Sequence, residues 1–408
     1  MKDRIILHCD CNSFFASVES VSHPEYKSVP MAVCGDPDER HGIVLAKNEL
    51  AKARGVQTAE TIWSAKRKCP NLLVVKPHYE EYTKFYHKIN EIYYRYTNIV
   101  EPFSIDESWL DVTGSTNLFG DGMTIAEEIR QVVKRELGIT VSIGVSYNKV
   151  FAKMGSDYKK PDAITEITRE NYKSLLHPLP VTELLFVGKS LAESLEKCNI
   201  RTIGDIARTS PDFLEKRFGK AGRTMHIYAN GEDTSEVIPP EKAEDSKSVG
   251  NGMTFRRDIS SDDDVRLGID SLSEEVAVRL RRNGYKALGV SLTIKDVYLQ
   301  QITRQCKLKN ATDTAREISS EAYSLYKKNW QSGKAIRMLT VTATPLARAE
   351  NVAEQIDFFD ESKDRERTRQ LELALDKIRD KFGKSSIRSG AVIGNDLGID
   401  NYESHSKE

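Results

Sequence analysis

The sequence has no uninterrupted run of 18 or more apolar residues, and it does not open with a charged and then apolar leader. A membrane-spanning helix needs about 20 mostly apolar residues, and a secretory signal needs an apolar segment near the start. We therefore expect no membrane association and a cytoplasmic location. No internal repeat or low-complexity tract is present, and 39% hydrophobic residues in a chain of 408 suffice for several folded cores.

Cysteine is scarce and scattered. The chain has no Cys-x-x-Cys pair, and its six cysteines stand apart from one another: Cys9, Cys11, Cys34, Cys69, Cys198 and Cys306. This distribution argues against a zinc ribbon and against a disulfide scaffold. We expect all six thiols to be reduced and structural.

The chain as a whole also lacks the basic excess that is typical of nucleic-acid-binding proteins, because its net charge is −1. Residues 247–345, however, hold 17 Lys and Arg against 11 Asp and Glu, a net charge of +6 that leaves −7 for the rest. Such segregation is typical of a module that grips phosphates while the remainder stays soluble. A merely solvated basic surface is the alternative.

Two adjacent acids, Asp106 and Glu107, lie between apolar residues that predict two short strands, with residues 104–107 at their connection. Adjacent acids in a strand point to opposite faces, so both reach one target only where the chain bends. Crowded carboxylates need a cation to relieve their repulsion. A divalent metal is the economical explanation, and a solvated acidic turn is the alternative.

A third acid, Asp10, ends the apolar run of residues 4–9 and precedes the amphipathic run of residues 14–19, which predicts a strand, a turn and a helix. An acid at the carboxyl end of a strand in an α/β domain lies where ligands generally bind, and the first amides of the next helix attract anions. Asp10, Asp106 and Glu107 together predict a site for two divalent ions, which enzymes of phosphoryl transfer use, polymerases among them.

Four segments in this order resemble the Y-family of translesion DNA polymerases: DCNSFFASVE (10–19), SIDESWLDVTGS (104–115), VSIGVSYNKVFAKMGSDYKKPDA (141–163) and KSVG (247–250). The resemblance runs from about residue 4 to about residue 346 and is similar to the bacterial DNA polymerase IV and V groups. It implies a multi-domain right-hand fold of α/β and α+β domains. The expected parts are a palm (1–20 and 80–165), fingers (21–79), a helical thumb (166–236), a linker (237–246), a little finger (247–346) and a tail (347–408).

The resemblance implies a DNA-templated reaction in which the primer 3′-hydroxyl attacks the α-phosphate of a deoxynucleotide. Two Mg²⁺ ions are then expected on Asp10, Asp106, Glu107 and the backbone carbonyl of Cys11. Phe15 matches the aromatic residue that excludes ribonucleotides, while Phe14 is expected to turn toward the fingers or the base. The lysines assigned to the triphosphate are Lys160, which precedes Pro161, and also Lys153 and Lys52.

Two positions depart from the family pattern. In the family a helix, here expected over residues 47–56, sends a Tyr and an Arg to the triphosphate, and this chain has Glu49 and Lys52 instead. Lysine lacks the bidentate fork of arginine, and a glutamate cannot donate a hydrogen bond. Residues 184–207 resemble a helix-hairpin-helix, where Gly188 matches the second glycine of the turn but Phe186 replaces the first, so the amide cradle is expected to change. A purely structural helical turn is the alternative.

Residues 247–346 predict a sheet with helices at 262–283 and 312–330, and a further helix is predicted at 363–381. The basic residues expected to follow the template and primer backbones are Arg256, Arg257, Lys295, Arg304, Lys307 and Arg337. In the tail, QIDFF (355–359) resembles the peptide by which bacterial polymerases dock on the sliding clamp, with Gln355, Phe358 and Phe359 filling pockets. Chance occurrence of so short a motif is the alternative. We expect a monomer that acts on primer-template DNA and deoxynucleotides.

Two other functions are compatible with parts of this pattern. Another palm-type nucleotidyl transferase, such as a nucleotide cyclase, would use similar acids without a template, but the basic domain and the hairpin-like thumb argue against it. A DNA-binding scaffold without activity is opposed by the presence of all three acids, although Glu49 and Phe186 keep it open.

Overall fold

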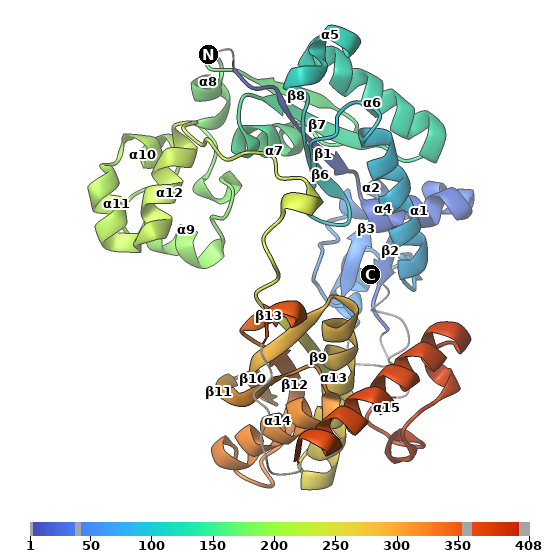
Figure 1. The fold of residues 1–408 in the computed structure, drawn as a ribbon. Helices are drawn as coiled ribbons and strands as arrows, with labels where there is room; N and C mark the ends of the chain where they lie inside the picture. Colours follow the sequence, from blue (N-terminus) through green and yellow to red (C-terminus); the bar gives the residue numbers. More distant parts are fainter. Residues whose placement is uncertain (1–2, 37–41, 353–360, 400–408) are drawn as a thin grey trace. The chain divides into compact units, whose positions relative to one another are not determined.

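The computed structural model describes residues 3–36, 42–352 and 361–399. The chain forms two compact units, the first built from residues 3–34 and 43–243 and the second mainly from residues 244–352 and 361–399 (Figure 1). Throughout the described ranges, no helix is both long enough and apolar enough to cross a membrane.

The main sheet of the first unit has the strand order β5-β6-β1-β7-β8. Its strands are β1 (Ile6–Cys11), β5 (Val100–Pro102), β6 (Glu107–Asp111), β7 (Val141–Ser146) and β8 (Ile164–Ile167). All neighbours pair antiparallel except β7 and β8, which are parallel. The structure therefore confirms the predicted hairpin around residues 104–107 and the predicted strand, turn and helix over residues 4–19. Asp10, however, lies in a strand that pairs antiparallel with both neighbours, so the rule that ligands bind at the carboxyl ends of parallel strands does not apply to it.

The two faces of this sheet carry different side chains because strand residues alternate in direction. Leu7 and Cys9 face a core built with α1 (Phe14–Ser22), α4 (Tyr79–Tyr93) and α6 (Gly122–Leu137). His8 and Asp10 face the other side, where α7 (Lys149–Tyr158) packs. At Gly144 a Cβ atom would lie 1.8 Å from the carbonyl oxygen of Ala152, so only glycine allows α7 to approach β7 this closely.

A small sheet with the order β3-β2-β4 is inserted between α1 and α4. It consists of β2 (Met31–Cys34), β3 (Val44–Lys47) and β4 (Leu73–Val75), with α2 (Glu49–Lys52) and α3 (Ile62–Lys68) beside it. The helix predicted over residues 47–56 is wrong in its extent, because Lys47 ends β3. The side chain of Asn48 accepts the backbone N–H of Ala51 at 3.0 Å and caps the short α2 instead.

The rest of the first unit is helical and has its own core, which includes Leu176, Leu195, Ile206 and Leu214. Its helices are α8 (Tyr172–Leu176), α9 (Lys189–Glu196), α10 (Ile203–Arg208), α11 (Pro211–Phe218) and α12 (Lys220–Ala229). The short helix α5 (Thr116–Phe119) precedes α6 in the chain.

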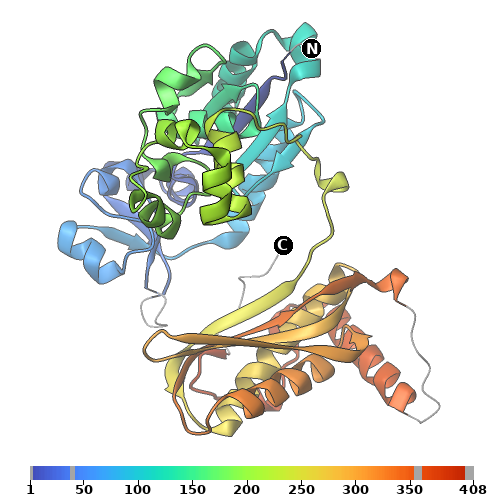
Figure 2. The same ribbon diagram turned by 90° about the vertical axis from the view of Figure 1, so that its left-hand side faces the viewer.

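The second unit contains an antiparallel sheet with the order β11-β10-β12-β9. Its long strands run across the lower half of Figure 2. The strands are β9 (Val249–Ile259), β10 (Tyr285–Asp296), β11 (Gln301–Thr312) and β12 (Ile336–Ala343), and β13 (Leu346–Arg348) also pairs with β10. One face is covered by α13 (Asp262–Arg282) and α14 (Ala315–Asn329). The two helices predicted in this region are confirmed.

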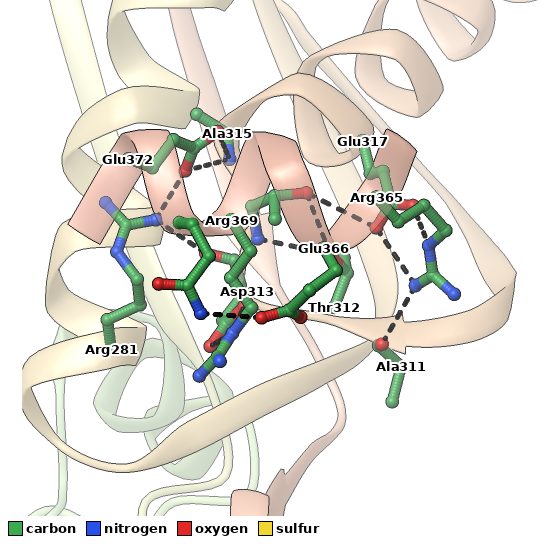
Figure 3. Close-up of polar contacts among 12 residues, drawn as sticks. Arg281, Ala311, Thr312, Asp313, Ala315, Glu317, Arg365, Glu366, Arg369 and Glu372 are labelled. Carbon is green, nitrogen blue, oxygen red and sulfur yellow. Dashed lines mark hydrogen bonds and ion pairs between the residues drawn. The ribbon is translucent and has the colours of Figure 1, made fainter. Parts of the chain in front are cut away.

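The segment after residue 346 continues the fold of the second unit. The predicted helix is confirmed as α15 (Glu361–Phe382), which binds α13 and the start of α14 through buried ion pairs (Figure 3). Arg281 donates to Glu372 at 2.5 Å and to Asp376 at 2.7 Å. Leu397 and Ile399 then join the core of this unit. Residues 361–399 are therefore part of the folded second unit, with α15 against its helices and Leu397 hydrogen-bonded to the backbone of Arg256 in β9.

Candidate active site

The three predicted acids meet where β6 begins beside β1. Asp10 is directly opposite Glu107 in the antiparallel register, so both side chains point to the face that carries α7. Asp106 lies in the bend just before β6, where its carbonyl accepts the N–H of Cys11 at 3.0 Å. Its carboxylate accepts the hydroxyl of Ser104 at 2.6 Å. The bend that the adjacent acids required is present, and we call Asp10, Asp106 and Glu107 the carboxylate cluster.

Burial and mutual repulsion perturb these acids. Burial raises the pKa of Asp10 to about 7, and the nearby Glu107 adds to the rise while Lys160 opposes it. Burial also raises the pKa of Asp106, again with a contribution from Glu107. For Glu107 burial acts in the same direction, but His8 and Lys153 outweigh it and lower the pKa to about 2. Burial thus disfavours the charged forms of Asp10 and Asp106, whereas Glu107 is held in its charged form.

Two lysines supply part of that charge. The Nζ atom of Lys160 lies 2.6 Å from Oδ2 of Asp10 and 2.7 Å from Asp157. The Nζ atom of Lys153, on α7, lies 2.5 Å from Oε2 of Glu107. Lys160 and Lys153 were both predicted from the sequence, and the fold places both against the carboxylate cluster.

The donor set of the cluster suits a hard divalent cation, because carboxylate and carbonyl oxygens are the ligands that Mg²⁺ prefers. In the described part of the chain, no group of three His, Cys, Asp or Glu side chains has the spacing of a ready-made metal site. Lysine ammonium groups instead contact two of the three carboxylates. The thiol of Cys11 is buried in the core of the opposite sheet face, so only its backbone carbonyl is available as a ligand.

His8 is a neighbour of the cluster that the sequence did not reveal. It is fully buried, and its Nδ1 lies 2.8 Å from the hydroxyl of Ser156. Its Nε2 lies 3.5 Å from Oε2 of Glu107 and has no hydrogen-bond partner among the described residues. Burial lowers the pKa of His8 to about 4, so the ring is neutral. The sequence did contain a signal for this position: His8 and Asp10 are two residues apart in one predicted strand, so their side chains point to the same face of the sheet.

The two phenylalanines after Asp10 have different surroundings. Phe14 is 3% exposed and packs in the core with Leu7 and Tyr82, so its predicted position toward the fingers or the base is wrong. Phe15 is only partly buried. Its ring stacks on that of Tyr82 with 4.1 Å between centroids and 11° between planes, and the ring of Tyr79 meets it edge-on at 5.9 Å. Of the two, only Phe15 retains an accessible ring.

Lys52 lies on α2 and is exposed. Its Nζ atom is 3.7 Å from Oε2 of Glu49, and Oε1 of Glu49 lies 3.5 Å from the hydroxyl of Ser13. Ser13 occupies the turn between β1 and α1. Glu49 therefore connects Lys52 to the turn that follows Asp10. The two residues that differ from the family pattern, Glu49 and Lys52, thus lie beside the predicted nucleotide site.

Gly188 is exposed and is the N-cap of α9, as the helix-hairpin-helix pattern requires. Phe186, at the position of the missing glycine, has φ 66° and is 68% exposed. This left-handed backbone is normally reserved for glycine. Phe186 therefore adopts a backbone conformation that usually requires glycine.

The basic residues of the second unit divide between the two faces of its sheet. Lys295 and Arg256 lie on the face opposite to α13 and α14, as the alternation beside Ile294 and Phe255 requires. Arg304 is opposite Leu292 and so lies on the helix-covered side of the edge strand β11. The residues predicted to follow the template and primer backbones are therefore divided between two faces, because neighbouring strand positions alternate.

Arg257 is another predicted DNA contact, and its guanidinium is bound to acids of the second unit. Its guanidinium donates to Asp264 at 2.9 Å and to Asp396 at 2.7 Å. These contacts raise the pKa of Arg257 and leave the charge compensated within the unit. Lys307 is exposed on β11, and Arg337 is at an irregularity of β12. The predicted clamp residues Gln355, Phe358 and Phe359 lie outside the described residues.

Known proteins resemble this chain over most of its length. Residues 9–157 match the impB/mucB/samB family, and residues 246–358 match the impB/mucB/samB family C-terminal domain. DNA polymerase IV of Acetivibrio thermocellus is 47% identical over 96% of this chain and 98% of the relative. DNA polymerase IV 1 of Bacillus subtilis is 37% identical over 96% of this chain and 94% of the relative. A Y-family DNA polymerase chimera of known structure aligns with a TM-score of 0.74 at 23% identity, covering 86% of this chain and all of the other.

Proposed function

Because the chain belongs to the impB/mucB/samB family of Y-family DNA polymerases, we propose that it copies primer-template DNA past damaged bases. The enzyme is a DNA-directed DNA polymerase that performs low-fidelity translesion synthesis with deoxynucleotides. The observation that carries this function is the carboxylate cluster, in which Asp10 and Glu107 are cross-strand neighbours and Lys160 and Lys153 stand beside them.

The family depends on divalent metal ions, and we assign two Mg²⁺ ions to this site. Asp10, Asp106, Glu107 and the carbonyl of Cys11 would hold them. When bound, such a pair of ions stabilises the attacking and the leaving oxygen of phosphoryl transfer. Burial raises the pKa of Asp10 and of Asp106, so bound cations would stabilise the charged forms of both carboxylates.

In the proposed reaction the oxygen of the primer 3′-hydroxyl forms a bond to the α-phosphorus of the deoxynucleotide. The bond from that phosphorus to the bridging oxygen breaks, and pyrophosphate leaves. Lys160 and Lys153 orient the triphosphate as flexible point charges, and exposed Lys52 reaches it from α2. Their present contacts with carboxylates keep these lysines close to where a triphosphate would lie.

Phe15 is the proposed selector of deoxyribose. A ring beneath the sugar leaves room for hydrogen at C2′ but not for a hydroxyl, so ribonucleotides are excluded by steric overlap. Its accessible ring supports this role, whereas Phe14 is confined to the core.

We assign the palm to residues 1–20 and 80–165, the fingers to 21–79, the thumb to 166–236, the linker to 237–246 and the little finger to 247–346. Gly188 in the thumb contacts the DNA backbone through amides, and Lys295 and Arg256 contact phosphates from the open face of the little-finger sheet. Arg337 and Lys307 are further candidates. A fluorescence titration should show affinity for primer-template DNA falling steeply as salt is added; a salt-independent affinity would remove these phosphate contacts.

We further propose that the chain acts as a monomer in the cytoplasm and docks on the sliding clamp through Gln355, Phe358 and Phe359. Replacing both phenylalanines with alanine should abolish stimulation of synthesis by the clamp while synthesis without the clamp continues. Stimulation equal to that of the wild type would refute the docking peptide.

A primer-extension assay tests the function itself. The substrate is a duplex with a single-stranded template overhang, undamaged or with a single lesion, together with deoxynucleotides and Mg²⁺. We expect templated extension on both substrates. A nucleotide cyclase would leave the primer unextended and convert the triphosphate, and a scaffold would bind the DNA without any turnover.

A further inference from the structure

Glu19 is a buried carboxylate that the proposed reaction does not use. It lies on α1 one helical turn after Phe15 and is 4% exposed. A carboxylate in a core is unfavourable unless hydrogen-bond partners satisfy it. The hydroxyl of Tyr82 donates to Oε1 of Glu19 at 2.5 Å, and the two carboxylate oxygens lie 2.9 and 3.1 Å from Nδ1 of His78. Both partners belong to the region where α4 begins.

These contacts close a ring of interactions around Phe15. Tyr82 is fully buried, and its ring stacks on that of Phe15 while its hydroxyl binds Glu19. Glu19 and Phe15 are themselves one turn apart on α1, so the helix backbone completes the ring. Tyr79 meets both Phe15 and Tyr82 edge-on, at 5.9 and 5.7 Å. The ring of Phe15 therefore rests against an aromatic surface, and the Tyr82 hydroxyl at its edge is held by Glu19 and by the backbone of His78.

We propose that Glu19 is a positioning residue for sugar selection, which acts by holding Tyr82 flat behind Phe15. Steric exclusion of a hydroxyl works only if the excluding ring cannot retreat, and a displacement of about 1 Å is enough to change a reaction strongly. Without the bond to Glu19, the buried ring of Tyr82 loses one of the contacts that hold its tilt, and Phe15 gains room to move away from a 2′-hydroxyl. The inference deepens the proposed function and rests on the role of Phe15 in it.

The test compares single-nucleotide insertion of a deoxynucleotide and of the matching ribonucleotide on one primer-template. The enzymes are the wild type, Phe15→Ala, Glu19→Gln and Tyr82→Phe. We expect Tyr82→Phe and Glu19→Gln to lower the ratio of kcat/KM for the two sugars about tenfold, the worth of one hydrogen bond to a charged group. Phe15→Ala should lower it more. The double variant Glu19→Gln with Tyr82→Phe should have a sugar ratio no lower than that of the more affected single variant, because both changes remove the same hydrogen bond.

The matched control is Tyr93→Phe. Tyr93 is a fully buried tyrosine of the same helix, about 16 Å further along its axis, and its hydroxyl interacts with the thiols of Cys9 and Cys11. Its removal should leave the sugar ratio unchanged, even if deoxynucleotide insertion or the melting temperature changes. If Glu19 had only a structural role, Tyr82→Phe would also keep the wild-type sugar ratio, even if its insertion rate or melting temperature changed.

A wild-type sugar ratio in Tyr82→Phe, together with a lost ratio in Phe15→Ala, overturns the role of Glu19 and leaves the role of Phe15 intact. A wild-type ratio in Phe15→Ala overturns both. If Glu19→Gln fails to fold, Tyr82→Phe still decides the question, because it keeps the stacked ring and removes only the hydroxyl.

Discussion

Two sets of buried carboxylates in this molecule are neutralised by different cations. In the carboxylate cluster the partners of Asp10 and Glu107 are Lys160 and Lys153, whose side chains are 27% and 14% exposed. At the interface between α15 and the rest of the second unit, the cations that pair with the carboxylates are arginines (Figure 3). We call this set of ion pairs the α15 interface; its members are Arg281, Asp313, Glu317, Arg365, Arg369, Glu372 and Asp376. The side chain of Arg281 there is only 4% exposed.

The difference follows from the chemistry of the two cations. Arginine presents a rigid fork that binds carboxylates through several hydrogen bonds at once, whereas lysine is a compact charge on a flexible stem. Arg281 contacts both oxygens of Asp376 and also the carbonyl of Asp313. Lysine pairs suit a site whose carboxylates must take up other cations, and arginine pairs suit an interface that remains closed. Four substitutions test this contrast.

The largest effect is expected for Asp106→Ala, with Asp10→Ala and Glu107→Ala as parallel cases. Extension should fall by at least about 10⁴-fold, or more than 5 kcal/mol in the activation barrier, because each change removes a proposed metal ligand. DNA binding should survive in all three variants, since each change removes a proposed metal ligand and not a phosphate contact. The melting temperature of Asp106→Ala should not fall, since this change removes a buried acid with a raised pKa. Primer extension and thermal unfolding measure the two; substantial extension by Asp106→Ala would end the two-metal assignment.

Arg281→Ala should destabilise the second unit by about 3–5 kcal/mol, because it leaves Glu372 and Asp376 buried without their cation. Denaturant unfolding followed by circular dichroism should show an earlier loss of helical signal. The matched control replaces Arg281, Glu372 and Asp376 together by apolar residues of similar size, which should recover most of the stability. If Arg281→Ala unfolds like the wild type, α15 is not held by this arginine.

Lys160→Ala should raise KM for the deoxynucleotide about tenfold, or about 1.4 kcal/mol, through the loss of one exposed point charge on the triphosphate. Stability should fall less than in Arg281→Ala, because Asp10, whose pKa burial raises to about 7, can take up a proton when Lys160 is removed. Steady-state insertion kinetics and a melting curve provide the readout. A large loss of stability with an unchanged KM would make Lys160 a structural cation like Arg281 and erase the contrast.

The smallest effect is expected for Arg316→Ala. Arg316 reaches Asp364 of α15 at 3.3 Å, but both side chains are more than two-thirds exposed, at 69% and 68%. Exposed pairs contribute about 0–1 kcal/mol and are screened by salt. The free energy of unfolding should therefore change by less than about 1 kcal/mol; a loss comparable to that of Arg281→Ala would show that burial does not decide the strength of these pairs.

The α15 interface also changes how the charge of residues 247–345 is understood. From the sequence, the positive excess of this region predicts a module that grips phosphates, with a solvated basic surface as the alternative. Part of it serves α15, because Arg281 and Arg282 bind acids at positions 372, 376 and 380, and Arg257 binds Asp396. Net charge along a sequence does not reveal which charges are paired, since pairing depends on contacts between distant segments.

The sequence by itself determined the elements that depend on local patterns. The strand, turn and helix around Asp10, the bend before Glu107 and the helix α15 follow from the spacing of apolar and polar residues, which acts within a few positions. The family resemblance of four ordered segments determined the chemistry, because it compares whole motifs and needs no contacts.

Only the tertiary structure decided which of these residues meet. Asp10 faces Glu107 because the register of β1 and β6 sets them opposite, and Lys153 reaches Glu107 because Gly144 lets α7 lie close to β7. The same holds for the bond of Tyr82 to Glu19, which joins positions 63 residues apart. Pairings of this kind arise from the packing of whole elements. The local sequence around each position therefore does not predict a partner that lies so far along the chain.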